Sequence, residues 1–144
     1  MGLGGRDKIK TVLIVEDNLD HVDLISISLR RSFSNAKIIH ASNGQEAIEI
    51  LGLSETFRKS GIKPDLIFLD VNLPKLPGIE ILQRIRSNPV YNQIPVIAIS
   101  TSARNEEIEN MLTLGANAYF IKTEKIDLGE KVKSLLFKDE MVFC

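Results

Sequence analysis

Short apolar runs alternate along the chain with longer stretches in which apolar and polar residues are mixed. One run, Leu-Ile-Phe-Leu at residues 66–69, is preceded by Pro64 and followed by Asp70 and the turn residues Pro74 and Pro77. Such a run is too short for a helix and is typical of a strand buried on both faces of a parallel sheet. By the same pattern we expect strands at residues 11–15, 36–40, 96–100 and 118–121.

Between these runs the apolar residues recur at the three- and four-residue spacing of amphipathic helices. We expect helices ending near Phe33, around residues 47–51, at 78–88, at 105–114 and at 126–136. In the helix at 105–114, Ile108, Met111 and Leu112 should face inward, and Gly115 should end it. The polar stretch 55–63 is either a loop or an extension of the second helix. Strands alternating with helices predict an α/β domain, a parallel sheet with helices on both faces.

With 144 residues, of which 44% are hydrophobic and 26% charged, the chain is long enough for one domain with a substantial core. We expect this domain at residues 9–137, with a flexible leader at 1–8 and a short tail at 138–144. No apolar run reaches membrane-spanning length, and a net charge of −1 argues against a nucleic-acid surface. The single cysteine, Cys144, cannot support a disulfide framework or a thiolate metal site, so a cytoplasmic location fits.

Acidic, hydroxyl and basic side chains stand where the predicted strands end. These are Glu16 and Asp17 after the first strand, Asp70 at the third, Ser100 at the fourth and Lys122 after the fifth. Taken singly, a strand-end aspartate usually caps a turn, and a lysine is usually a surface charge. In an open α/β sheet, however, the carboxyl ends of the strands share the edge where ligands bind. We therefore expect the five side chains to form one site.

The residue types in this set suit phosphoryl transfer. Three clustered carboxylates repel one another unless a cation holds them, and oxygen ligands favour a hard ion such as Mg²⁺. A lysine and a hydroxyl opposite that ion would neutralise the oxygens of an incoming phosphoryl group. Carboxylates form acyl-phosphate intermediates, so Asp70 is the candidate nucleophile.

The set Glu16-Asp17, Asp70, Ser100 and Lys122 resembles the response regulator receiver domain of two-component signalling. The resemblance spans roughly residues 10–136. It implies a doubly wound, five-stranded, flavodoxin-like (CheY-like) sheet with the strand order 2-1-3-4-5. The alternation of strands and helices alone does not give that order.

The resemblance also implies a role for each residue. Mg²⁺ would bind to Asp17, Asp70 and the backbone carbonyl of Asn72, and Glu16 would act through a bound water. Asp70 would take the phosphoryl group from a phosphohistidine of a sensor histidine kinase. Ser100 would then hydrogen-bond the group, and Lys122 would pair with it. Tyr119 matches the aromatic switch residue, although it could also simply be a packing residue.

Two positions depart from the usual receiver pattern. Thr123 follows Lys122 where proline is common, often in a cis peptide, so a cis bond here would be costly. Pro77 stands where an acidic residue is frequent before Gly78. Residues 72–75, the polar segment after the second helix and residues 100–102 resemble the single-domain regulators of bacterial phytochromes, which tend to dimerise through the face of the fourth and fifth helices. Ser102 matches a variable position that tunes loss of the phosphoryl group.

Two other functions stay open from the sequence. An aspartyl-phosphate phosphatase of the haloacid dehalogenase type needs a second aspartate two residues after the nucleophile, where this chain has Asn72. An unphosphorylated pseudo-receiver would act by protein contact alone. For the receiver, too few residues follow 136 for an output domain, so we expect a phosphorelay step or contact with a protein partner rather than an enzyme. His21 and His40 should be a solvated helix-start residue and a strand-end residue.

Overall fold

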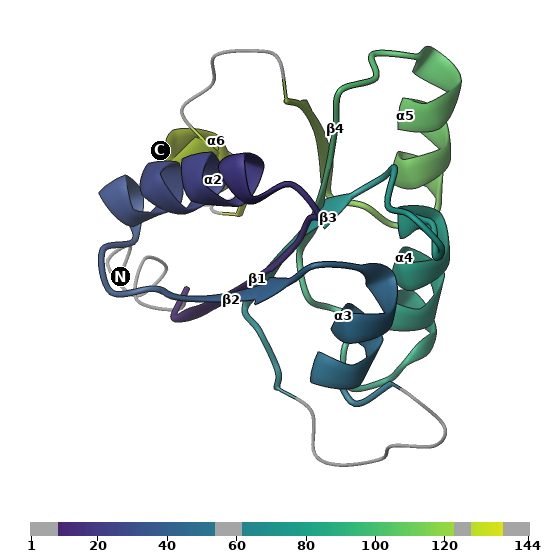
Figure 1. Cartoon of the computed structure of the whole chain (residues 1–144), viewed down its shortest axis with the longest axis horizontal. Helices are drawn as coiled ribbons and strands as arrows, with labels where there is room; N and C mark the ends of the chain where they lie inside the picture. Colours follow the sequence, from purple (N-terminus) through teal and green to yellow (C-terminus); the bar gives the residue numbers. More distant parts are fainter. Residues whose placement is uncertain (1–8, 54–61, 123–127, 137–144) are drawn as a thin grey trace, which may run out of the picture.

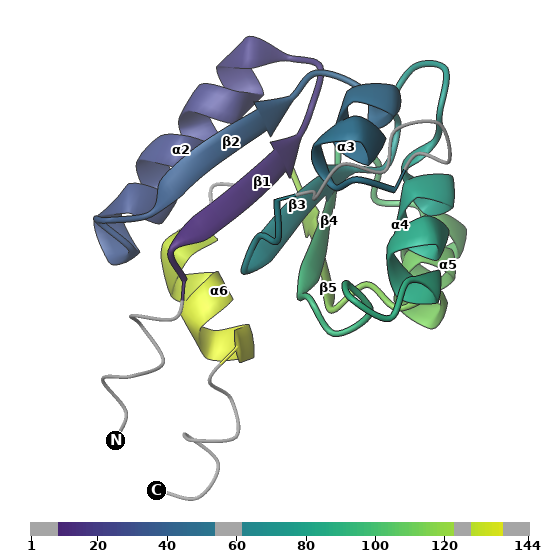
Figure 2. The ribbon, with the colours of Figure 1, turned by 90° about the horizontal axis from the view of Figure 1, so that it is seen from below.

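The computed structural model of the chain describes residues 9–53, 62–122 and 128–136. Within them lie five strands, β1 (Thr11–Val15), β2 (Lys37–Ala41), β3 (Leu66–Asp70), β4 (Val96–Ser100) and β5 (Ala118–Ile121). The strands pair in parallel in the order β2-β1-β3-β4-β5, with β3 at the centre between β1 and β4 (Figure 2). This order confirms the predicted flavodoxin-like sheet.

Five helices of the described residues complete the alternation: α2 (Leu19–Ser32), α3 (Gly44–Ile50), α4 (Gly78–Ser87), α5 (Asn105–Thr113) and α6 (Leu128–Leu136). Helices α2 and α6 cover one face of the sheet, whereas α3, α4 and α5 cover the other (Figure 1). The predictions for residues 1–8, 126–127 and 138–144, and for most of 55–63, lie outside the described residues.

The sheet separates two hydrophobic cores, and the strands contribute side chains to both. Along β3, Ile67 and Leu69 join the core under α3, α4 and α5, while Leu66 and Phe68 join the core under α2 and α6. All four side chains are fully buried. Because successive strand residues point to opposite faces, a strand covered on both sides must be apolar throughout. This is why β1, β3 and β4 appear as unbroken apolar runs in the sequence. The edge strand β2, which contains Lys37 and His40, is only partly buried, so the prediction that it is buried on both faces is wrong.

Strand β2 begins and ends one residue later than predicted. The Lys37 backbone N–H donates to the Lys10 carbonyl (2.7 Å), and Lys37 pairs with Thr11 in the sheet. Ala36 instead donates its N–H to the Phe33 carbonyl (3.0 Å) in the turn that ends α2. Ala36 is apolar and buried, so its side chain resembles a strand residue although its backbone belongs to the turn.

Helix α5 corrects one core prediction. Met111 is buried, as expected, and Ile108 is half-buried, but Leu112 is 44% exposed. Successive helical positions are about 100° apart, so a helix that buries a narrow stripe centred on Met111 turns the next residue outward. A full inward-facing cluster would need a broader contact than α5 makes near the edge of the sheet.

Candidate functional site

The carboxyl ends of β1, β3, β4 and β5 meet at one edge of the sheet, as parallel pairing requires. Glu16 and Asp17 follow β1 and Asp70 ends β3, and these three residues each offer a carboxylate oxygen within 4.8 Å of the other two. Glu16 and Asp70 are buried, whereas Asp17 is exposed. The structure thus places the three acidic residues in one cluster that opens to solvent at Asp17.

Lys122 joins two of the three acids. Its Nζ lies 3.0 Å from Asp70 Oδ2 and 2.5 Å from Glu16 Oε1. The Lys122 side chain is only 11% exposed. Its backbone is placed by a hydrogen bond from the Lys122 N–H to the Ser100 carbonyl (2.7 Å), which continues the pairing of β4 with β5. Lys122 therefore lies beside Asp70, as the alignment of the strand ends predicted. Thr123, whose preceding peptide bond was in question, lies outside the described residues.

Glu16 is held at several atoms. Its Oε2 accepts the backbone N–H groups of Asp17 (3.0 Å) and Asn18 (3.4 Å). Its Oε1 faces both Lys122 and His21. Burial raises the pKa of Glu16 to about 8, and hydrogen bonding with Asp70 adds to the increase although Lys122 opposes it. A charged carboxylate is therefore costly here, which is the situation that a bound divalent cation relieves. The donor set fits such an ion.

This raised pKa predicts how the metal-free protein responds to pH. The folded state binds the Glu16 proton more tightly than the unfolded state, whose pKa is near 4.5. The free energy of unfolding should therefore fall as pH rises from about 4.5 to about 8, by an amount on the order of a few kcal/mol. Urea unfolding in EDTA measures this slope. Glu16→Gln should flatten it, and an unchanged slope in that variant would contradict the prediction.

Asp70 ends β3 at the start of a loop that folds back closely on the strand. Its Oδ1 accepts the Asn72 backbone N–H (3.0 Å), and its side chain is almost fully buried. Gly78 returns so near that a Cβ atom there would lie 2.5 Å from the Asp70 carbonyl oxygen. The Gly78 N–H also donates to the Val71 carbonyl (3.2 Å). This close approach requires glycine as the first residue of α4.

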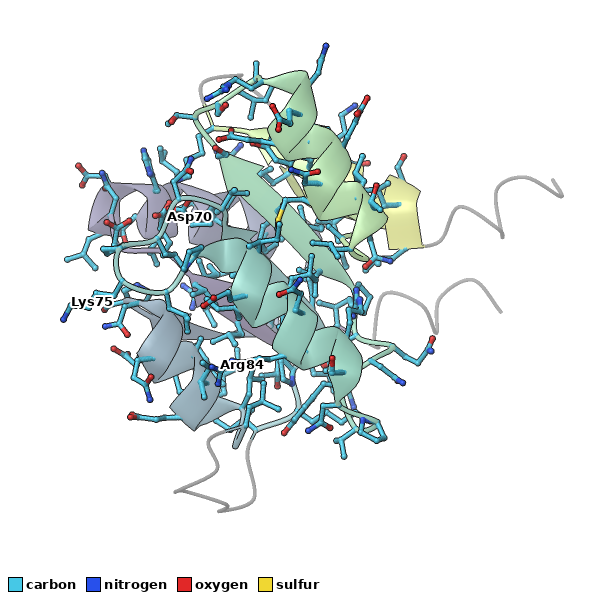
Figure 3. All side chains as sticks on the ribbon, turned by 90° about the vertical axis from the view of Figure 1, so that its right-hand side faces the viewer. Asp70, Lys75 and Arg84 are labelled. Atoms are coloured by element: carbon cyan, nitrogen blue, oxygen red, sulfur yellow. The ribbon has the colours of Figure 1, made fainter. Side chains whose placement is uncertain are left out.

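The middle of the same loop contains a strained turn at Lys75 (Figure 3). Lys75 has φ of 68°, and the Leu76 N–H donates to the Pro74 carbonyl (2.8 Å). This is a γ-turn of the rare hand, which costs energy for a residue with a Cβ atom. We expect Lys75→Gly to be about 1 kcal/mol more stable than Lys75→Ala in urea unfolding. Both variants lose the lysine side chain, so equal stabilities would argue against strain at this position.

Ser100 is connected to the residues around it by hydrogen bonds. Its Oγ accepts the Asn72 side-chain amide (2.9 Å) and the Ser102 backbone N–H (3.0 Å). The Tyr119 hydroxyl, on β5, donates to the Ser102 carbonyl (3.1 Å), and Tyr119 itself is half-buried. The structure therefore links Tyr119 to Ser100 through Ser102. The switch role of Tyr119 stays a prediction.

The two histidines make contacts with Glu16 that the sequence did not predict. His21 was expected to be solvated, yet its side chain is only 31% exposed and its Nδ1 lies 3.1 Å from Glu16 Oε1. His40, at the end of β2, places its Nε2 2.7 Å from the Glu16 carbonyl oxygen. The one available signal is positional: His21 lies in the first turn of α2, directly after the strand end that carries Glu16. Neither contact follows from residue spacing alone.

Comparison with known proteins gives consistent matches over most of the chain. The family model described as response regulator receiver domain matches residues 12–133. The chain is 32% identical over 127 residues to the response regulator Rcp1 of Synechocystis sp., covering 88% of this chain and 86% of that protein.

No helix among the described residues is both long and apolar enough to span a membrane.

Two solved structures are similar in fold. One is the Mn²⁺-bound form of the response regulator Rcp1, with 29% identity and a TM-score of 0.74, covering 87% of this chain and 92% of that chain. The other is the phosphorylated cyanobacterial phytochrome response regulator RcpA, with 29% identity and a TM-score of 0.73, covering 94% of this chain and 96% of that chain.

Proposed function

Because the chain belongs to the response regulator receiver domain family, we propose that Asp70 accepts a phosphoryl group from a phosphohistidine of a sensor histidine kinase. One observation carries the proposal. Three carboxylates lie within 4.8 Å of one another, and Lys122 contacts both Asp70 and the buried Glu16. A structural ion pair needs only one acid for each base, so the surplus of carboxyl groups at this edge favours a site for a cation and a phosphoryl group.

We propose that the cation is Mg²⁺, held by Asp17, Asp70 and the backbone carbonyl of Asn72, with Glu16 acting through a water molecule. When bound, Mg²⁺ would offset the charge of the carboxylates and of the phosphoryl oxygens. Exposed Asp17 gives the ion a route in from solvent. The existence of a Mn²⁺-bound form of the relative Rcp1 supports the binding of a divalent ion.

In the transfer step an Asp70 carboxylate oxygen attacks phosphorus as the P–N bond to the donor histidine breaks. The bonding electron pair returns to the imidazole nitrogen, and Asp70 becomes an acyl phosphate. Lys122 lies beside the attacking carboxylate, where its charge neutralises the phosphoryl oxygens. The Ser100 hydroxyl donates a hydrogen bond to the transferred group.

The phosphorylated state would then act on a protein partner or pass the phosphoryl group onward in a relay. We propose that Tyr119 reports the state at the face formed by α5, β5 and α6, and that this face can also pair two copies of the chain. A phytochrome-like kinase is the proposed donor, which the likeness to the phytochrome response regulator RcpA supports.

Acetyl phosphate with Mg²⁺ tests the proposal without a kinase. We expect intact-mass spectrometry to detect the gain of one labile phosphoryl group. This gain should not occur in Asp70→Asn or in the presence of EDTA. Continuous release of phosphate from phosphate esters would instead indicate the phosphatase. No modification and no turnover would indicate the pseudo-receiver.

A further inference from the structure

Asn72 contacts both the proposed phosphoacceptor and the hydroxyl that would respond to it. Its backbone N–H donates to Asp70 Oδ1 (3.0 Å), and its side-chain amide donates to Ser100 Oγ (2.9 Å). Asp70 and Ser100 belong to adjacent strands and are buried, whereas Asn72 is exposed. One exposed residue therefore connects two buried residues of the site through two different groups.

The amide of Asn72 completes the bonding of the Ser100 oxygen. A hydroxyl oxygen has two lone pairs, and Ser100 Oγ accepts two N–H groups, one from Asn72 and one from Ser102. With both lone pairs used, the position of the oxygen is fixed. Its proton alone stays available for a phosphoryl oxygen. Asn72 thus determines where the hydroxyl stands before Asp70 is modified.

We propose that the Asn72 side chain is a positioning residue, which holds the Ser100 hydroxyl in the unphosphorylated arrangement and releases it when Asp70 is phosphorylated. This inference rests on the proposed phosphorylation of Asp70. Release is inexpensive on the asparagine side because an exposed amide exchanges its protein partner for water. Ser100 is fully buried and cannot make that exchange, so its hydroxyl gains most from the new acceptor on Asp70.

The hydrogen bond between Asn72 and Ser100 is connected, through Ser102, to Tyr119. The N–H of Ser102 donates to Ser100 Oγ, and the carbonyl of Ser102 accepts the Tyr119 hydroxyl. A movement of Ser100 therefore disturbs Ser102 and, with it, the hydrogen bond of Tyr119. Release of Ser100 by Asn72 should be detectable at Tyr119 without any change to the tyrosine itself.

Binding of beryllofluoride at saturating Mg²⁺ tests the proposal, since beryllofluoride mimics the phosphoryl group on an aspartate. Asn72→Ala removes a bond made only before phosphorylation, so we expect beryllofluoride to bind about two- to tenfold more tightly. In a Ser100→Ala background the amide has no hydroxyl to hold, and Asn72→Ala should then leave the affinity unchanged. Asn110→Ala, an exposed asparagine on α5, is the matched control and should bind as the parent does.

Tyrosine fluorescence gives a second readout in the absence of beryllofluoride. Tyr91 and Tyr119 are the only tyrosines, and the chain has no tryptophan, so Tyr91→Phe leaves Tyr119 as the single reporter. In that background Asn72→Ala should move the emission of the metal-bound protein part of the way toward its beryllofluoride-bound value. A merely structural role of Asn72 would lower stability without this directed shift.

The outcomes separate the inference from the proposed function. If the parent protein binds no beryllofluoride, phosphorylation of Asp70 fails as a proposal. If the parent binds it and Asn72→Ala binds it equally or more weakly, the amide does not restrain Ser100, and the inference is overturned. An equal gain in the Ser100→Ala background would likewise overturn it, because Asn72 would then act through another residue.

Discussion

Lys122→Met should slow the phosphorylation of Asp70 by acetyl phosphate about 100-fold while leaving Mg²⁺ binding unchanged or tighter. The Lys122 ammonium lies 3.0 Å from Asp70 Oδ2, so it is positioned to neutralise charge that develops on the phosphoryl group. Removal of one such preorganised group typically costs a factor of about 10²–10³ in rate. The same ammonium competes with a metal ion for Glu16 and Asp70, so its loss should favour the ion.

A slower phosphorylation without weaker Mg²⁺ binding distinguishes a role of Lys122 in the chemistry from a role in the fold. A variant that merely disturbed the fold would weaken Mg²⁺ binding and phosphorylation together. Mg²⁺ affinity is measured by titration of metal-free protein, and the rate by intact mass at saturating Mg²⁺. Lys131→Met, which removes an exposed lysine of α6, is the matched control and should change neither quantity. A parallel loss of both in Lys122→Met would show that the lysine acts through the fold.

The central strands, and the meeting of their carboxyl ends at one edge of the sheet, were predictable because both follow from the unbroken apolar runs. A sheet covered on both faces requires unbroken apolar runs, and β1, β3 and β4 show them. Once the strands are parallel, their carboxyl ends must lie together, which brings Asp70 near Glu16 without knowledge of any loop. The strand order required the family resemblance, because the alternation of elements is compatible with several orders.

Side-chain hydrogen bonds at that edge were not predictable from the same pattern. The bond from Asn72 to Ser100 depends on the path of the loop after β3, which includes a γ-turn at Lys75. Lysine gives no sequence signal for a positive φ, since glycine and asparagine are the usual residues there. The contact of His21 with Glu16 depends similarly on how α2 leaves β1. Periodicity locates elements, whereas loop conformation decides which polar groups meet.

Arg86 is another residue whose contribution depends on loops, and its removal should lower stability more than removal of a neighbouring exposed arginine. It lies in the last turn of α4, and its guanidinium donates to the carbonyl of Gly115 twice (3.0 and 2.7 Å) and to the carbonyl of Ile94 (2.8 Å). A further bond reaches the side chain of Asn117 (3.0 Å), whose oxygen also accepts the Val96 N–H (2.9 Å). Arg86 therefore connects α4 to the segments that enter β4 and β5.

We expect Arg86→Ala to lower the free energy of unfolding by about 3 kcal/mol, because carbonyls that accept from a charged donor lose their partner together. Arg86→Lys should recover less than half of this loss, since an ammonium cannot reproduce the planar fork. Arg84→Ala, an exposed arginine two residues earlier in α4 (Figure 3), should change stability by no more than about 0.5 kcal/mol. Urea unfolding of the three variants measures the differences.

These contacts lie at the end of the sheet opposite to Asp70, since they precede β4 and β5 whereas the site follows them. Well below its unfolding transition, Arg86→Ala should therefore accept a phosphoryl group from acetyl phosphate at the parent rate. A loss of stability equal to that of Arg84→Ala would mean that water replaces the guanidinium at little cost. A loss of phosphorylation in fully folded protein would mean instead that the Arg86 contacts hold β4 and β5 in the register on which Ser100 and Lys122 depend.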